Sequence, residues 1–485
     1  GINTIWQKRF SIATETLVRH NAIQAMTSIS KIKMAAVAGT VAAAAFAWYI
    51  KGRNDLAKGF TASRVPPEGK VATYRVTAIE RNERIMVTGR QAFTAVDTGV
   101  KNDISFAELL ATDNTVLYTY DLGQNIFVFL TVPDKAALWR EPFLDRGVRK
   151  LAASRAYVCS IDTAQKYWEA HKSDLPDSSQ DTFLMIWNTG RCGSTLLARL
   201  TTATSATVTL SEPDWVDQLG HDKAKLEADP DRYHQLVRLL HVFDFHLGRT
   251  LVPAEQAGQK TIYSLNPKGM AGFLREPVAQ IFPETKHVFM YRDMLKVIES
   301  FGSIKGSPPL LLKMKLAIDG VIGAGQFAGK GKGKAKGKGS GKGSAALRNV
   351  IDSLKKPSTP IVQGLSMMWL DAMLTWMEWK EGRGNKSENL TLRMDEFVTK
   401  DLEKRTAVVR KVLQFAGIPD EAVMMEKAMA VFAIHSQAGT AMEKSSAKTG
   451  KTFLTDLDKS ELIALCAQVP DIGKPSFVIP GSLGV

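Results

Sequence analysis

One segment, 182–197, constrains the fold of this chain more than any other part of the sequence. It reads TFLMIWNTGRCGSTLL: an apolar run long enough for a buried strand, a tight polar turn with two glycines, and leucines spaced for a helix. A strand that turns through glycines into a helix leaves backbone N–H groups unpaired at the positive end of the helix dipole. The segment therefore predicts an anion site within an α/β fold.

The side chains of the turn support an anion site and restrict its class. Arg191 adds a fixed cation, and Ser194 and Thr195 add hydroxyl donors. The nucleotide-hydrolase loop G-x-x-x-x-G-K-[ST] needs a lysine before its hydroxyl residue, whereas the glycines here are three apart with no lysine. We therefore expect a phosphate or sulfate cradle rather than an NTPase loop.

Residues 281–301, IFPETKHVFMYRDMLKVIESF, form a second candidate anion site. An apolar run that ends at Tyr291 predicts a buried strand, Arg292 and Asp293 follow it, and a helix comes next. Ligands of open α/β sheets bind at the carboxyl ends of strands, so Arg292 stands where a ligand contact is expected. A surface ion pair between Arg292 and Asp293 is the alternative.

Together the two motifs resemble the sulfotransferases that use 3′-phosphoadenosine 5′-phosphosulfate (PAPS). Thr-Gly-Arg-Cys-Gly-Ser-Thr-Leu-Leu is similar to their 5′-phosphosulfate loop, in the branch with arginine that includes tyrosylprotein and many carbohydrate sulfotransferases. The segment 281–301 resembles their 3′-phosphate motif, F-P-x-x-K-x-x-x-x-x-R-D…S, with Met294 where the family usually has proline. The resemblance covers less than half of the chain.

The resemblance implies a fold, a reaction and a set of donor contacts. The fold is α/β, a parallel sheet sandwiched by helices, and the reaction moves a sulfuryl group from PAPS, a co-substrate, to a hydroxyl acceptor without a metal. Arg292 and Ser300 would bind the 3′-phosphate. The 5′-phosphosulfate would lie on the loop residues Thr189, Gly190, Arg191, Cys192, Gly193, Ser194 and Thr195.

Glu212 is the candidate general base, because the resembling enzymes carry a glutamate shortly after the first helix. It follows a predicted strand at 207–210, and a carboxylate partly removed from water can have its pKa raised toward proton abstraction. Capping of the next helix is the alternative role. His241 and His246 are more distant competitors, since the cytosolic branch of the family uses a histidine base.

Arg191 and Lys268 are the other catalytic candidates. The resemblance implies that Arg191 and the loop amides stabilise charge on the bridging oxygen of the donor. The segment 260–269, KTIYSLNPKG, resembles the strand that carries a lysine toward the reaction centre, although Lys268 lies after the Asn-Pro turn.

Two later segments extend the resemblance. Residues 389–400 with 408–419 resemble the last core strand and a helix that ends at Gly417. Residues 435–453 resemble the C-terminal loop that covers the nucleotide, and they suit a solvated loop equally well.

Length and composition allow a second domain beside the catalytic one. The chain has 485 residues, of which 45% are hydrophobic. The sequence predicts a small α+β module over 60–175. The prediction rests on short apolar or alternating runs, a hairpin turn at 121–124 and a helix near 146–170. The runs that suggest strands are 71–80, 84–93, 115–122 and 125–133. The catalytic unit is expected over 176–455, with an insertion at about 302–360 and a C-terminal tail at 456–485.

Three cysteines, Cys159, Cys192 and Cys466, are too few and too scattered for a disulfide scaffold or a zinc site. Cys192 stands next to an arginine at a helix N-terminus, a setting that favours a reactive thiolate. The simpler interpretation is a small residue that the tight loop tolerates. We predict no metal site.

The N-terminal segments predict the subcellular location of the protein. The uncharged run 34–50 lies between basic residues and is at the lower length limit for a bilayer span. We expect a signal-anchor that places the catalytic unit in the secretory pathway, facing the Golgi lumen; sequons at Asn385 and Asn389 agree with this. A cleaved signal peptide, if translation starts at Met26, and an organelle transit sequence in the basic segment 1–33 are the alternatives.

The net charge of +14 suggests nucleic-acid binding, but much of this positive charge is concentrated in one short segment. The lysine–glycine tract, residues 329–343, reads GKGKGKAKGKGSGKG, and without its six lysines the charge is 14 − 6 = +8. A run of this composition cannot bury apolar surface. We expect no specific nucleic-acid partner, and either non-specific polyanion contact through the tract or a solvated insertion without function.

The acceptor is a hydroxyl whose class the sequence leaves open among glycan, protein and lipid. Two other functions compete with sulfuryl transfer. One is a P-loop kinase-like phosphotransferase, which would need magnesium ligands that the motifs do not supply. The other is a catalytically inactive, membrane-anchored nucleotide-binding protein that keeps the fold.

Replacing the lysine–glycine tract by a short Gly-Ser linker should leave the melting temperature unchanged, because no buried contact is lost. Retention on heparin should weaken and its salt dependence become shallower, since six cations are removed. Calorimetry and heparin chromatography at several salt concentrations measure both effects. A large drop in melting temperature would contradict the expected insertion.

Overall fold

The computed structural model describes residues 59–80, 92–141, 143–177, 181–204, 207–249, 261–269, 271–302, 360–382, 387–433, 453–469 and 471–483. The expected anchor at 34–50, the lysine–glycine tract and most of the expected nucleotide-covering loop lie outside these residues. Among the described helices, none combines the length and the apolar character that a bilayer crossing requires.

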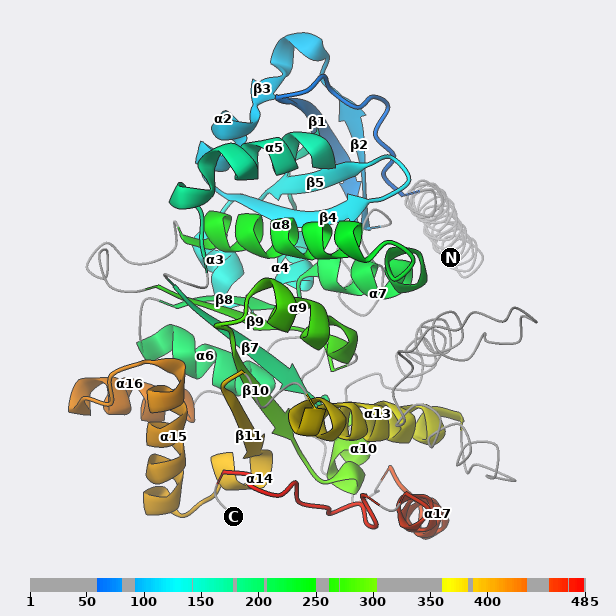
Figure 1. Cartoon of the computed structure of the whole chain (residues 1–485), viewed down its shortest axis with the longest axis vertical. Coiled ribbons are helices and arrows are strands. Elements are labelled where there is room, and N and C mark those ends of the chain that lie inside the picture. Colours follow the sequence, from blue (N-terminus) through cyan, green and yellow to red (C-terminus); the bar gives the residue numbers. More distant parts are fainter. Residues whose placement is uncertain are drawn as a thin grey trace, which may run out of the picture. The chain divides into compact units, whose positions relative to one another are not determined.

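A five-stranded parallel sheet positions the anion loop (Figure 1). Its order is β11-β10-β7-β9-β8, and every neighbouring pair is parallel. The strands are β7 (Thr182–Asn188), β8 (Thr207–Ser211), β9 (Ile262–Asn266), β10 (Lys286–Tyr291) and β11 (Asn389–Arg393). The carboxyl ends of parallel strands meet at one edge, so the segment after β7 opens at the middle of that edge. The predicted α/β class is confirmed.

Both faces of this sheet are covered, which explains the continuous apolar run of β7. Phe183, Met185 and Trp187 pack into one core cluster, and Leu184 and Ile186 pack into another, because alternate residues of a strand point to opposite faces. The second cluster is completed by α6 (Ser194–Thr204), α15 (Leu402–Ala416) and α16 (Ala422–Val431). The first is completed by α7 (Asp214–Leu226), α8 (Pro230–Arg249), α9 (Arg275–Ile281), α10 (Met294–Gly302) and α13 (Pro360–Gly382).

The expected module over 60–175 contains an antiparallel sheet of order β2-β1-β6-β5-β4, with β3 (Ile104–Ser105) also paired to β1. Its other strands are β1 (Lys70–Ile79), β2 (Phe93–Asp97), β4 (Thr115–Asp121), β5 (Ile126–Thr131) and β6 (Arg155–Ser160). Its helices are α2 (Phe106–Ala111), α3 (Lys135–Arg140), α4 (Leu144–Lys150) and α5 (Ile161–His171). Short 3₁₀ turns lie at Val100–Asn102, Lys172–Asp174 and, in the parallel unit, Ala271–Leu274.

The structure confirms three predicted strands of this module and corrects two other elements. The strands expected at 71–80, 115–122 and 125–133 are β1, β4 and β5, and β4 and β5 form the expected hairpin. The helix expected near 146–170 is wrong, because β6 divides it into α4 and α5. β6 pairs with β1 on one side and β5 on the other, and these distant partners override the local helical pattern. The run at 84–93 contributes only its last residue to β2; residues 81–91 lie outside the description.

α15 ends at Ala416 and is capped by Gly417, whose φ of 77° is left-handed; the sequence places the end of this helix at Gly417.

The last described residues pack against the parallel sheet. After α14 (Met394–Phe397) and α17 (Asp456–Ala467), the chain returns to β11, where Leu483 N–H donates to Thr391 O at 2.8 Å. Tyr291 Oη and Ser482 Oγ are hydrogen-bonded at 2.9 Å.

Trp376→Ala should destabilise the protein by about 3–5 kcal/mol, the usual cost of removing a large core aromatic. Trp376 is fully buried on α13, its ring lies 4.9 Å from that of Phe289, and its indole donates to Thr391 Oγ1 at 3.1 Å. Leu457→Ala is the control: that side chain is 65% exposed, so its loss should cost within about 0.5 kcal/mol. Denaturant unfolding measures both; equal effects would contradict the packing of α13.

Candidate functional site

The loop between β7 and α6 has the backbone of an anion cradle. Gly190, Arg191 and Gly193 have φ of 75°, 50° and 88°, all in the left-handed region. Glycine adopts this region freely, whereas Arg191 is an outlier of the kind that clusters at functional sites. Left-handed residues interspersed in a turn direct successive N–H groups toward one concave surface, which is where anions bind.

The amides that can meet an anion follow Gly190. The Gly190 N–H donates to Asn188 Oδ1 at 2.9 Å, and the Thr189 N–H donates to Met290 O at 3.1 Å. The intrahelical ladder of α6 begins with Leu196 and Leu197, which both donate to Gly193 O. The N–H groups of 191–195 therefore occupy the position where a helix N-terminus offers donors to an anion.

Arg191 joins the two sequence motifs. Its Nε donates to Ser300 Oγ on α10 at 3.0 Å, across 109 positions of sequence. Burial, and then the nearby positive charge of Arg292, lower the pKa of Arg191 to about 10. The guanidinium is still protonated at neutral pH. The residues predicted to bind the 5′- and 3′-ends of one nucleotide are thus brought together.

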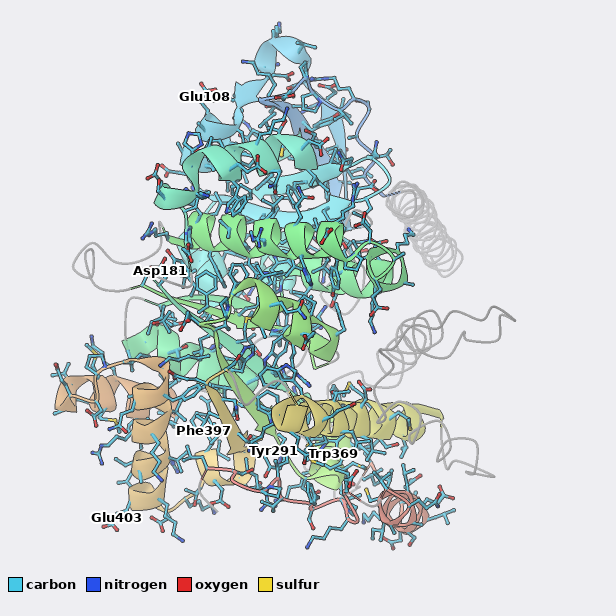
Figure 2. All side chains as sticks on the ribbon, in the orientation of Figure 1. Glu108, Asp181, Tyr291, Trp369, Phe397 and Glu403 are labelled. Carbon is cyan, nitrogen blue, oxygen red and sulfur yellow. The ribbon has the colours of Figure 1, made fainter. Side chains whose placement is uncertain are left out.

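Arg292 directly follows β10 and lies beside this pair. Figure 2 labels its neighbours Tyr291, at the end of β10, and Trp369 on α13, whose indole donates to Arg292 O at 2.7 Å. Arg292 Nε is buried and has no hydrogen-bond partner in the described part of the chain. A buried N–H without a partner, near a second arginine, is a cost that a bound anion would relieve.

Glu212 is the first residue after β8 and is half-buried. Its φ of 51° is left-handed, and its N–H donates to Asn266 O at 2.8 Å. Burial raises the pKa of Glu212, while the cations Lys268 and Arg146 oppose the rise. The N-cap of α7 is Pro213 rather than Glu212, so helix capping does not explain this carboxylate.

Lys268 lies after β9 and is paired with a carboxylate. Its Nζ forms an ion pair with Asp217 Oδ2 on α7. Burial lowers the pKa of Lys268, but Asp217 and Glu212 raise it by more, so the net shift is upward. Lys268 is therefore a fixed cation beside Glu212 and not a proton acceptor at neutral pH.

The antiparallel module contributes a residue that sequence reasoning missed. Arg146 on α4 acts electrostatically on Glu212, and its guanidinium lies 4.8 Å from the ring centre of Phe143. Its Nη1 is buried, and none of the described residues forms a hydrogen bond with it. The adjacent Asp145 is engaged by Tyr118 Oη at 2.7 Å and by Arg149 at 3.2 Å. No motif surrounds Arg146 in the sequence, so only the packing of α4 reveals it.

The surroundings of one histidine competitor, His241, argue against a role as the base. His241 is fully buried on α8, its Nδ1 lies 2.7 Å from Val237 O, and burial lowers its pKa to about 4. A buried core imidazole cannot reach an acceptor. His246 also has a lowered pKa, from burial and from Arg249 and Lys135, neither of which belongs to the anion loop.

Cys192 is a packing residue. It is fully buried among the apolar side chains of the α6 face, and burial raises its pKa, which is the opposite of a reactive thiolate. Cys159 and Cys466 are also buried free thiols. Within the described residues, no group of three or more His, Cys, Asp or Glu side chains could hold a metal ion.

Comparison with known proteins gives structural matches alone. No protein-family model matches the sequence, and no curated protein shows significant similarity to it. Among solved structures, the sulfotransferase domain from the Curacin biosynthetic pathway matches 62% of this chain and 93% of its own, at 12% identity and a TM-score of 0.28. A mouse sulfotransferase complexed with PAP matches 60% and 85%, at 12% identity and 0.30. A Mycobacterium avium sulfotransferase matches 64% and 80%, at 12% identity and 0.32. Similarity of this degree does not define function.

Proposed function

We propose that this protein is a sulfotransferase that uses PAPS to sulfate a hydroxyl acceptor. The observation that carries the proposal is the hydrogen bond from Arg191 to Ser300, with Arg292 beside it. It joins a phosphosulfate-type loop and a 3′-phosphate-type motif into one positive site. A molecule with anionic groups at both ends of a nucleoside matches such a site better than a single phosphate does.

The donor side is formed by the anion loop and α10. The backbone amides of 191–195, with Arg191, Ser194 and Thr195, would hold the 5′-phosphosulfate. Arg292 and Ser300 would hold the 3′-phosphate, which would give the buried Nε of Arg292 a partner. When bound, PAPS supplies the sulfuryl group.

The acceptor side is formed by Glu212, Lys268 and Arg146. Glu212 would accept the proton of the acceptor hydroxyl, a role that its raised pKa favours. Lys268, held by Asp217, would stabilise negative charge without exchanging its proton. The acceptor class is open among glycan, protein and lipid hydroxyls. Membrane anchoring through 34–50, a secretory location and polyanion contact through the lysine–glycine tract stay predictions from sequence.

The wild-type chain should bind 3′,5′-adenosine bisphosphate more tightly than 5′-AMP by about 2–3 kcal/mol, the scale of charge-assisted hydrogen bonds. Arg292→Ala should remove most of this preference, because Arg292 would contact only the 3′-phosphate. Isothermal titration without and with magnesium measures both affinities.

Lys296→Ala is the control for Arg292→Ala. Lys296 is an exposed cation on the same helix as Ser300, and it pairs with Asp395 at 3.0 Å. Its removal changes the net charge equally and should keep the preference. Equal wild-type affinity for the two nucleotides would reject the sulfotransferase assignment, and tighter binding of ATP with magnesium would favour a phosphotransferase.

Glu212→Gln should lower turnover by about 10²–10⁴-fold with little change in nucleotide affinity, because the shape stays and the base is lost. Activity needs ionised Glu212, so the rate should fall as pH falls through the pKa of Glu212, which lies above the usual glutamate value. Transfer to the acceptor, or slow donor hydrolysis in its absence, gives the rate. Unchanged turnover would show that another group is the base or that the protein is inactive.

Arg146→Ala should move the acidic limb of the pH–rate profile to higher pH. The Arg146 cation favours ionised Glu212, so its removal raises the pKa of Glu212 further. Arg146→Lys keeps the positive charge, so the acidic limb of its pH–rate profile should lie at the wild-type pH. A limb that stays in place in both variants would show that Arg146 has no influence on the base.

A further inference from the structure

Two buried asparagines connect the carboxyl ends of β7, β9 and β8. Asn188 ends β7 and is 6% exposed; Asn266 ends β9 and is 1% exposed. Asn188 Nδ2 donates to Pro267 O at 2.8 Å and to Asn266 Oδ1 at 3.3 Å. Asn266 Nδ2 donates to Ser211 Oγ at the end of β8, at 3.1 Å.

Each of the two asparagines also accepts a hydrogen bond from the N–H of a left-handed residue of the site. On the donor side, Asn188 Oδ1 accepts from the N–H of Gly190, which precedes Arg191. On the acceptor side, Asn266 O accepts from the N–H of Glu212. Because left-handed conformations at Arg191 and Glu212 are unfavourable by themselves, the surrounding hydrogen bonds must hold them.

Gly269 provides an independent contact between the same segments. A Cβ added at Gly269 would lie 3.0 Å from Gly190 N and 3.1 Å from Asn188 O. These are backbone atoms and cannot rotate away. The segment 267–269, which carries Lys268, therefore packs directly on the backbone of the anion loop.

We propose, on the basis of the proposed function, that Asn188 is a positioning residue of the anion loop and that Gly269 permits the contact it needs. The Asn188 carboxamide fixes Gly190 with its oxygen and the segment of Lys268 with its nitrogen. Through Asn266 it also joins the segment of Glu212. Donor amides and acceptor-side charges are thereby held in one fixed arrangement, which lowers the reorganisation needed when an anion binds.

The test measures anion affinity of the full-length chain with 3′,5′-adenosine bisphosphate and with inorganic pyrophosphate. Asn188→Ala should raise both dissociation constants by about 10- to 100-fold, since the amides of 191–195 lose their fixed direction. Gly269→Ala should act in the same direction while Asn188 stays intact. If Asn188→Ala does not fold, Gly269→Ala decides the question by itself.

Gly220→Ala is the matched control, because the added Cβ on α7 would lie 3.5 Å from the ring of Phe273 in the 3₁₀ turn Ala271–Leu274, which is an ordinary van der Waals distance. It should leave both dissociation constants unchanged. The proposal would be overturned if Asn188→Ala and Gly269→Ala lower the melting temperature but leave both dissociation constants unchanged, with one site per chain. That result would show that the two residues have a merely structural role.

Pyrophosphate separates this inference from the proposed function. A wild-type chain that binds pyrophosphate but does not prefer 3′,5′-adenosine bisphosphate over 5′-AMP would reject sulfuryl transfer, and the effect of Asn188→Ala on pyrophosphate would still test positioning. A wild-type chain that binds none of these anions would overturn both.

Discussion

Hydrogen bonding of β7 on both of its edges, to β10 and to β9, is the constraint on which the site depends. It places the carboxyl end of β7 between two other strand ends, so that the loop after β7 meets residues from both sides. Arg292 comes from the β10 side, and Asn266 and Lys268 come from the β9 side. An edge strand would have brought the loop to residues of one neighbour alone. The apolar sequence of β7 suits this position, because a central parallel strand has no face in water.

Partial burial gives the site its electrostatic character. The same removal from water lowers the pKa of Arg191 and raises that of Glu212. Both pKa values therefore lie closer to neutral pH than they would in solution. Lys268 shows the opposite outcome, because Asp217 and Glu212 compensate for its burial. The proposed donor side thus keeps cations that a bound anion would satisfy, while the proposed acceptor side holds a carboxylate whose affinity for a proton is increased.

The antiparallel module takes part in this balance. Its strand β4 packs against α7 and α8 of the parallel unit, and the ring of Phe106 on α2 lies 5.1 Å from that of Phe243 on α8. That packing brings Arg146 within electrostatic range of Glu212. Within the module itself, Tyr118 and Arg149 engage the neighbouring carboxylate of Asp145. A module without catalytic motifs of its own can therefore influence the proposed base, through charge alone.

The sequence by itself determined the parallel α/β class, the strand–loop–helix at 182–197 and the strand before Arg292, because local periodicity and glycine placement specify these elements. It did not determine β6, since the segment 155–160 becomes a strand only between β1 and β5. Nor did it determine which charges surround Glu212, or that His241 and Cys192 are buried. Asn188 ends a strand like many polar residues, and its role rests on Pro267 and Asn266, 79 and 78 positions away. Contacts over such distances are decided by tertiary packing, because no local pattern in the sequence encodes which strand ends become neighbours.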